Sequence, residues 1–143
     1  MGILQKVNEE AMYEALNPLL FPNEEIEAAV YAIYRPTGFF SSVRQVDFGY
    51  LALTNQNRLI GYRYGTLMGS APIAVDLNAI LKMRFRKRVF GLQRELYLET
   101  MSAKSEKLLV LYNMKIFGSQ FPNQKENAER LSAVLAEKAA MFK

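Results

Sequence analysis

The chain contains neither cysteine nor histidine. Without cysteine it forms no disulfide, offers no thiolate to a metal ion and has no thiol nucleophile. Without histidine it lacks the side chain most often used as a general base and as a metal ligand. These absences exclude the commonest catalytic and metal-binding arrangements. The absence of cysteine also agrees with a reducing compartment, so we expect a cytoplasmic protein.

The carboxylates and lysines that remain show no catalytic pattern. The acidic residues are scattered singly or stand on the N-terminal arm and on outward strand faces, without the spacing of a calcium loop or of a paired acid and base. No glycine-rich phosphate loop precedes an expected helix. The sequence therefore predicts no enzymatic activity, no cofactor and no metal, and it favours a function in binding.

Long apolar runs are missing as well. The longest comprises residues 28–34, far short of the roughly 20 residues that span a bilayer. With 143 residues, half of them hydrophobic, the chain is long enough for one core and too short for two independent domains. We expect an acidic helical arm over residues 1–20, one domain over residues 21–143, and no transmembrane segment.

The net charge of +4 is distributed unevenly. Residues 1–27 carry six glutamates and one lysine, a net charge of −5, whereas residues 28–143 carry 17 bases and 8 acids, a net charge of +9. A basic region attracts anionic lipid, nucleic acid or an acidic protein surface. The acidic arm is itself a candidate partner, and it could fold onto the domain, lie between subunits or stay separate.

Apolar residues at steps of three and four predict a helix at each end of the chain. The first covers residues 3–16, and Pro18 prevents its continuation. The second begins after Asn123, a good N-cap, with Glu126 placed to accept a hydrogen bond from the backbone N–H of that cap. The stripes are Leu4, Val7, Ala11 and Ala15 in the first helix, and Ala128, Leu131, Val134, Leu135, Lys138 and Phe142 in the second.

Between the helices, β-rich runs alternate with turn residues. Asn residues at 55 and 57 tolerate the left-handed backbone of a tight turn, and a second hairpin loop is expected over residues 90–93. The expected strands cover residues 27–35, 48–54, 58–64, 73–77, 80–89, 94–101 and 108–112.

The segment Gly-Tyr-Leu-Ala-Leu-Thr-Asn-Gln-Asn-Arg-Leu-Ile, residues 49–60, resembles the hairpin of bacterial PH-like and GRAM-like domains. Residues 74–77, Ala-Val-Asp-Leu, followed by Ile80, resemble the next strand of that family. The resemblance in layout covers residues 24–141. It implies a mainly β (α+β) fold, a PH-like barrel of about seven antiparallel strands capped by a C-terminal amphipathic helix, with a short N-terminal helix in addition. Such barrels bind phosphoinositides, proteins or copies of themselves.

Residues 77–94 contain six bases and no acid. Because a strand alternates sides, Lys82, Arg84, Arg86 and Arg88 project together, while Met83, Phe85 and Val89 point into the barrel. This basic stripe could contact phosphates.

The alternative is a solvated face neutralised by ion pairs. A loop over residues 90–93 places Arg88 opposite Glu95 and Arg84 opposite Glu99, and it leaves Arg86 beside Tyr97 as the main unpaired cation. Each such pair stabilises a sheet by only about 0.2–1 kcal/mol, but together they would remove much of the charge.

The loop after the first strand holds a second set of candidate binding residues. Inositide-binding PH domains place several bases at this point, and this chain has Arg35 and Arg44 there without the third base of the pattern. The adjacent Phe39 and Phe40 would suit a membrane surface or a partner's pocket if exposed, and they would pack under the barrel or against another subunit if buried.

The hypothesis favoured by these observations is a non-catalytic module for protein–protein interaction or self-association. The alternative is peripheral binding to anionic lipid, at the inner membrane surface, through the basic strand and the aromatic loop. No RNP-like string is present, and the aromatic residues of the basic strand have inward parity, which argues against nucleic acid.

Overall fold

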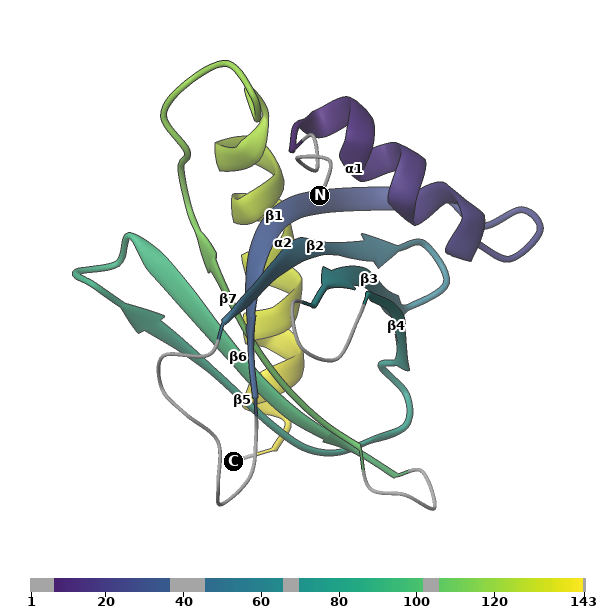
Figure 1. Cartoon of the computed structure of the whole chain (residues 1–143). Coiled ribbons are helices and arrows are strands. Elements are labelled where there is room, and N and C mark those ends of the chain that lie inside the picture. The colour runs from purple at the N-terminus through teal and green to yellow at the C-terminus, as the bar shows by residue number, and fades with distance from the viewer. Residues whose placement is uncertain (1–6, 37–45, 66–69, 102–105, 143) are drawn as a thin grey trace.

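The computed structural model describes residues 7–36, 46–65, 70–101 and 106–142. The described residues form one antiparallel sheet of seven strands with a helix packed on each side of it (Figure 1). The helical elements are α1 (Glu9–Leu16), the 3-10 turn η1 (Asn17–Leu19) and α2 (Gln124–Ala140). The strands are β1 (Ile26–Arg35), β2 (Asp47–Thr54), β3 (Arg58–Tyr64), β4 (Ala71–Asp76), β5 (Ile80–Arg88), β6 (Gln93–Thr100) and β7 (Lys107–Asn113).

The strand order is β4-β3-β2-β1-β7-β6-β5, so β4 and β5 are the edges of an open sheet. The first strand, β1, joins two halves because it pairs with β2 over most of its length and with β7 only over Ile33–Arg35. Figure 1 shows the halves bent around α2. The predicted architecture, mainly β with seven antiparallel strands, a C-terminal helix and a short N-terminal helix, is confirmed.

The concave face of the sheet carries the main core, which α2 covers. Alternate residues of β1 such as Val30 and Tyr34 belong to it, together with Leu98 of β6 and Leu131 and Leu135 of α2. Leu131 and Leu135 are completely buried, as the predicted apolar stripe of this helix requires. The terminal helix therefore closes the bent sheet by burying its side chains between the two halves.

The start of α2 differs from the prediction. Asn123 makes no capping hydrogen bond through its side chain, and its backbone N–H donates to Glu9 Oε2 over 2.7 Å. The Asn123 side chain also donates to Glu9 Oε1 over 3.0 Å. The expected return of Glu126 to the cap is therefore wrong, because a carboxylate from α1, distant in sequence, accepts that N–H instead.

The other face of the sheet carries α1. Met12 and Leu16 are buried against Ala29, Ala52 and Ile60 of the first three strands. The predicted stripe through Ala11 and Ala15 is displaced by one residue, since these two alanines are only partly buried. The helix also starts later than predicted, at Glu9. Asn8 caps it by accepting the Ala11 N–H over 2.8 Å, and the two glutamates of the first turn suit the positive end of the helix dipole. Residues 3–6 of the predicted helix lie outside the described residues.

A buried ion pair ties the α1–β1 connection to the β2–β3 hairpin. Arg58 donates to both oxygens of Glu24, over 2.6 and 2.9 Å, and also to the Leu19 carbonyl over 3.0 Å. Glu24 accepts further hydrogen bonds from the Thr54 hydroxyl and the Phe21 N–H. The hydrogen bonds from Arg58, helped by those from Thr54 and Phe21, outweigh burial and lower the pKa of Glu24 from 4.5 to about 2. Glu24 is therefore charged at neutral pH and, through Arg58, holds the connection after α1 against the β2–β3 hairpin.

Candidate binding surfaces

The four bases of the predicted stripe lie on edge strand β5, and the parity assigned to them is correct. Lys82, Arg84, Arg86 and Arg88 are all exposed on the face turned away from the core. Met83 is buried and Phe85 is partly buried on the opposite face. An edge strand of this composition offers its cations to water, and the charge also discourages pairing with another strand.

The hairpin after β5 turns one residue earlier than predicted. Arg88 pairs with Gln93, so the loop covers residues 89–92, and the cross-strand partners of residues 82–88 are displaced by two residues. Val89, Phe90 and Gly91 all adopt positive φ, and Gly91 N–H donates to the Arg88 carbonyl over 3.1 Å. Val89 thus belongs to the turn and is 57% exposed, which contradicts its predicted inward position.

The corrected register changes the ion pairs. Arg86 lies opposite Glu95 with its Nη2 2.5 Å from Oε2, and Arg88 Nη1 lies 2.7 Å from Oε1. Burial raises the pKa of Glu95, but the hydrogen bonds from the two arginines outweigh it, so its pKa lies below the ordinary value. Arg86 is therefore not the unpaired cation that was predicted. Because one carboxylate serves two arginines, this cluster keeps a net charge of +1.

Arg84 occupies the place beside Tyr97, with its guanidinium carbon 4.9 Å from the ring centroid. Tyr97 pairs with Leu109 of β7, and Leu109 pairs with Arg35 of β1. Neighbouring residues in such a row share one face of the sheet. The structure therefore places Arg35 on the same face as the stripe, at the other end of a four-strand row. We call this surface, defined by Arg35, Lys82, Arg84, Arg86 and Arg88, the basic face.

Arg35 is the only member of the predicted loop set among the described residues. Its Nε atom is buried and has no hydrogen-bond partner among them. Phe39, Phe40 and Arg44 lie outside the described residues. The grouping of Arg35 with those three residues stays a prediction.

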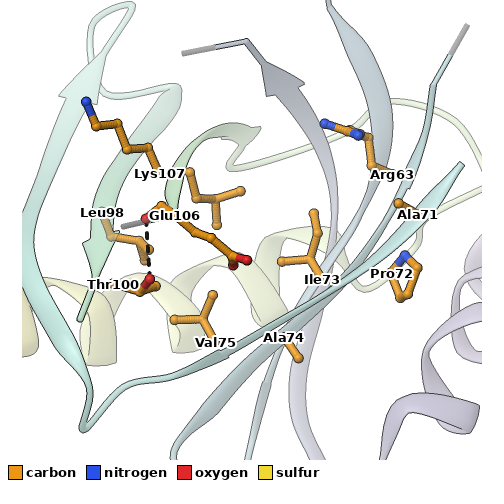
Figure 2. Close-up of a pocket in the computed structure, with 11 residues that line it drawn as sticks. Arg63, Ala71, Pro72, Ile73, Ala74, Val75, Leu98, Thr100, Glu106 and Lys107 are labelled. Atoms are coloured by element: carbon orange, nitrogen blue, oxygen red, sulfur yellow. Dashed lines mark hydrogen bonds between the residues drawn. The ribbon is translucent and has the colours of Figure 1, made fainter. Parts of the chain in front are cut away.

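A cleft of about 380 Å³ lies between β4 and the adjoining ends of β6 and β7. Ile73 and Val75 line one side and Leu98 the other, and Figure 2 shows the Glu106 carboxylate directed between them. Arg63 also lines the cleft, and its Nε atom lies 3.7 Å from Asp47 Oδ2. In the described part of the chain no three acidic side chains gather as metal ligands. The sequence did not predict this cleft, because its walls come from strands that are distant in the chain.

The face that carries α1 also exposes a group of aromatic side chains. Tyr31, Phe48, Tyr62 and Tyr64 are half-buried around the completely buried Tyr50. Phe48 stacks on Tyr64 with ring centroids 5.2 Å apart, and Tyr62 lies 5.0 Å from Tyr64. We call the four half-buried rings the aromatic face.

Two hollows adjoin these rings on this side of the sheet. One, of about 340 Å³, is lined by Val7, Tyr31 and Phe121, and another, of about 540 Å³, by α1 together with Tyr62 and Tyr64. The helix therefore covers only part of the aromatic surface on its side of the sheet.

No family model matches the chain, and no curated protein matches it. Among solved structures it is similar to the hSac2 domain from human phosphoinositide phosphatase Sac2, with a TM-score of 0.50 and 13% sequence identity. The similarity covers 93% of this chain and 79% of that domain. At this identity the similarity shows the fold alone, and it is consistent with the predicted PH-like fold. None of the helices in the described ranges is long and apolar enough to cross a membrane.

Proposed function

We propose that this chain is a non-catalytic, PH-like binding module that associates with a protein surface, in the first instance with a second copy of itself. The aromatic face is the observation that carries the proposal. A relationship to bacterial PH-like and GRAM-like domains, based on the hairpin over residues 49–60, is part of the same proposal.

The composition of the aromatic face suits a protein interface. Tyrosine and phenylalanine are enriched at the buried centres of interfaces, because a rigid ring buries much apolar area and loses little side-chain entropy. Tyr31, Tyr62 and Tyr64 each combine an apolar ring with a hydroxyl group. Such side chains stay solvated in the monomer and still contribute hydrogen bonds in a complex.

The shape of this face supports the same proposal. The hollows on the α1 side of the sheet offer recesses next to the rings, into which side chains of a partner would fit. Glu10 and Glu14 of α1 are exposed, and Glu14 lines the larger hollow together with Tyr62 and Tyr64. A partner surface that combines apolar groups with bases would complement them, and the basic residues of a second copy meet this requirement.

The cleft between β4 and the ends of β6 and β7 supports a function without catalysis. Among its described lining residues Glu106 is the one acid, and no second carboxylate stands within the lining to form an acid and base pair. The remaining polar side chains of the lining are Arg63, Lys107 and Thr100, and Thr100 donates to the Glu106 carbonyl over 3.5 Å. This set offers charge and hydrogen bonds to a ligand but no activated nucleophile.

Sedimentation velocity over a wide range of protein concentration tests the proposal. The wild type should associate reversibly, and Phe48→Arg and Tyr62→Arg should each shift the protein to monomer while keeping a cooperative melting transition, at a temperature lowered by the lost ring contacts. Phe117→Arg is the matched control, because Phe117 is 85% exposed and outside the aromatic face. A wild type that stays monomeric throughout contradicts self-association. Deletion of residues 1–20 is a poor test, since it removes the buried Met12 and Leu16 from the sheet.

A further inference from the structure

The tip of the β5–β6 hairpin is apolar and projects into solvent. The exposed fraction of Phe90 is 104%, that of a residue with no neighbours, and the exposed fraction of Leu92 is 64%. Figure 1 shows the hairpin extending beyond the rest of the sheet on the left of the view. All three large apolar side chains of the tip, those of Val89, Phe90 and Leu92, thus stay more than half exposed, and Phe90 gains no burial from the fold.

The backbone of the tip makes these residue types more unusual. Val89 and Phe90 have φ values of 51° and 55°, a region that favours asparagine and glycine and is a true outlier for a β-branched residue. The next residue, Gly91, has a φ of 86°, which glycine adopts without cost. Val89 and Phe90 are unfavourable in left-handed backbone and are more than half exposed. The stability of the fold therefore does not explain why these residue types are present at the tip.

The apolar tip is surrounded by positive charge. Lys87 and Arg88 precede it, and Arg94 follows it and donates to the Gly91 carbonyl over 2.7 Å. The first acid beyond the tip, Glu95, is already shared between Arg86 and Arg88. A ligand that combines apolar groups with negative charge would therefore complement this tip.

The chain that follows β7 begins beside the tip and has the same character. The Met114 N–H donates to the Leu92 carbonyl over 2.9 Å. Three residues later Phe117 is 85% exposed, and the Lys115 amine lies 5.3 Å from its ring centroid. The segment that leaves this end of the sheet thus carries a second exposed aromatic residue with an adjacent base.

Shape decides which kind of ligand fits. The tip is a narrow protrusion of three side chains, too small for a stable protein interface, which buries about 800 Å² on each partner. Nucleic acid would satisfy the bases and leave the apolar tip in water. The interface of an anionic bilayer accepts a protruding apolar tip of any outline and attracts the bases around it.

We propose that residues 89–92 insert into the interface of an anionic lipid bilayer while the surrounding bases bind its headgroups. The site lies on the half of the sheet away from the aromatic face, and it shares no residue with that face. The tip and the basic face can contact a membrane in one orientation, because the basic face adjoins the tip along β5.

Vesicle co-sedimentation of the full chain provides the first test, with phosphatidylcholine vesicles compared with vesicles that also contain phosphatidylserine. The wild type should bind the second kind and be released by salt. The double variant Val89→Asn, Phe90→Gly fits the backbone of the turn better, so it should melt at a higher temperature and yet bind vesicles about tenfold more weakly. Leu81→Ser, on the same strand and at a residue that is 57% exposed, is the matched control and should bind as the wild type does.

Fluorescence provides the second test, because the chain contains no tryptophan. The Phe90→Trp variant carries a single indole reporter at the tip, and its emission should shift to the blue with phosphatidylserine vesicles and be quenched by brominated acyl chains. The Leu81→Trp variant should show neither effect. Heparin, a soluble polyanion, should leave the emission of the Phe90→Trp variant unchanged.

Several results would overturn the inference. These are no binding to phosphatidylserine vesicles, unchanged binding by the Val89→Asn, Phe90→Gly variant, or an unmoved emission of the Phe90→Trp variant while it sediments with vesicles. An equal blue shift with heparin would assign the tip to a soluble anion instead. Phe48→Arg separates the two proposals, since it should abolish self-association and leave vesicle binding intact.

Discussion

Glu24 and Glu95 are both held by arginine, but their arginines lie in different surroundings. The exposed fraction of the side chain is 0% for Glu24 and 10% for Arg58. Glu95 is nearly as buried at 9%, whereas Arg86 and Arg88 keep 62% and 47% of their side-chain surface in water. One cluster is therefore closed, and the other presents cations to whatever approaches.

The difference follows from what each carboxylate must satisfy. Glu24 lies between the α1–β1 connection and the β2–β3 hairpin, where its oxygens accept hydrogen bonds from Arg58, Thr54 and the Phe21 N–H. A buried charge is tolerated only with such complete pairing. Glu95 lies on an open sheet face, so water solvates the two arginines that bind it. Its two ion pairs therefore contribute little to stability. A closed cluster organises the fold, and an open cluster is available for binding.

The largest effect should come from breaking the closed cluster. Arg58→Met leaves the Glu24 carboxylate buried without its main partner and should lower the free energy of unfolding by about 3–5 kcal/mol. Urea denaturation measures the change. Arg86→Met, the matched variant of the open cluster, should cost about 1 kcal/mol or less. Equal losses for the two variants would remove the distinction between the clusters.

Acid should reveal the same contrast with a smaller effect. The pKa of Glu24 falls from 4.5 to about 2 on folding, so its charge stabilises the protein above pH 4.5, and this stabilisation is lost as the pH falls towards 2. The melting temperature should therefore decline over this interval, and Glu24→Gln, although less stable at neutral pH, should show a flatter decline. If the slope of the variant equals that of the wild type, Glu24 does not carry the effect.

The smallest change in stability should come from the open cluster. Glu95→Gln removes the carboxylate between two solvated arginines and should lower the free energy of unfolding by about 1 kcal/mol. The same substitution adds one unit of positive charge beside the hairpin tip, so binding to phosphatidylserine vesicles should become stronger. Denaturation and co-sedimentation of one preparation measure both quantities. Weaker vesicle binding would contradict the electrostatic part of the membrane proposal.

Local sequence patterns predicted most of the fold. The strand over residues 58–64 was predicted with the bounds observed, because the asparagine before it adopts the left-handed turn that was expected, with φ of 58° at Asn57. The apolar stripe of α2 was also correct at Ala128, Leu131 and Leu135. In both cases the signal, a turn residue or an apolar period, lies within a short stretch of sequence. It can therefore be recognised without knowing which other segments pack against that stretch.

Patterns failed where a turn had no characteristic residues. The loop after β5 holds valine and phenylalanine in left-handed backbone, which no propensity predicts, and the resulting shift of the turn by one residue moved Arg86 from Tyr97 to Glu95. The apolar tip was missed for the same reason, since Val89 was counted as part of the strand. The aromatic face was readable in part, because Phe48, Tyr62 and Tyr64 share one parity along their strands.

The sequence by itself determined which side chains alternate between the two faces of each strand and where the closing helix lies, because the period of the apolar residues is a local property of the chain. Only the tertiary structure decided which residues meet. The Glu24–Arg58 pair joins segments 34 residues apart, and the contact of Glu9 with Asn123 joins residues 114 apart. Such contacts depend on the register and bend of the whole sheet, which are set by the summed burial of many side chains rather than by any one segment.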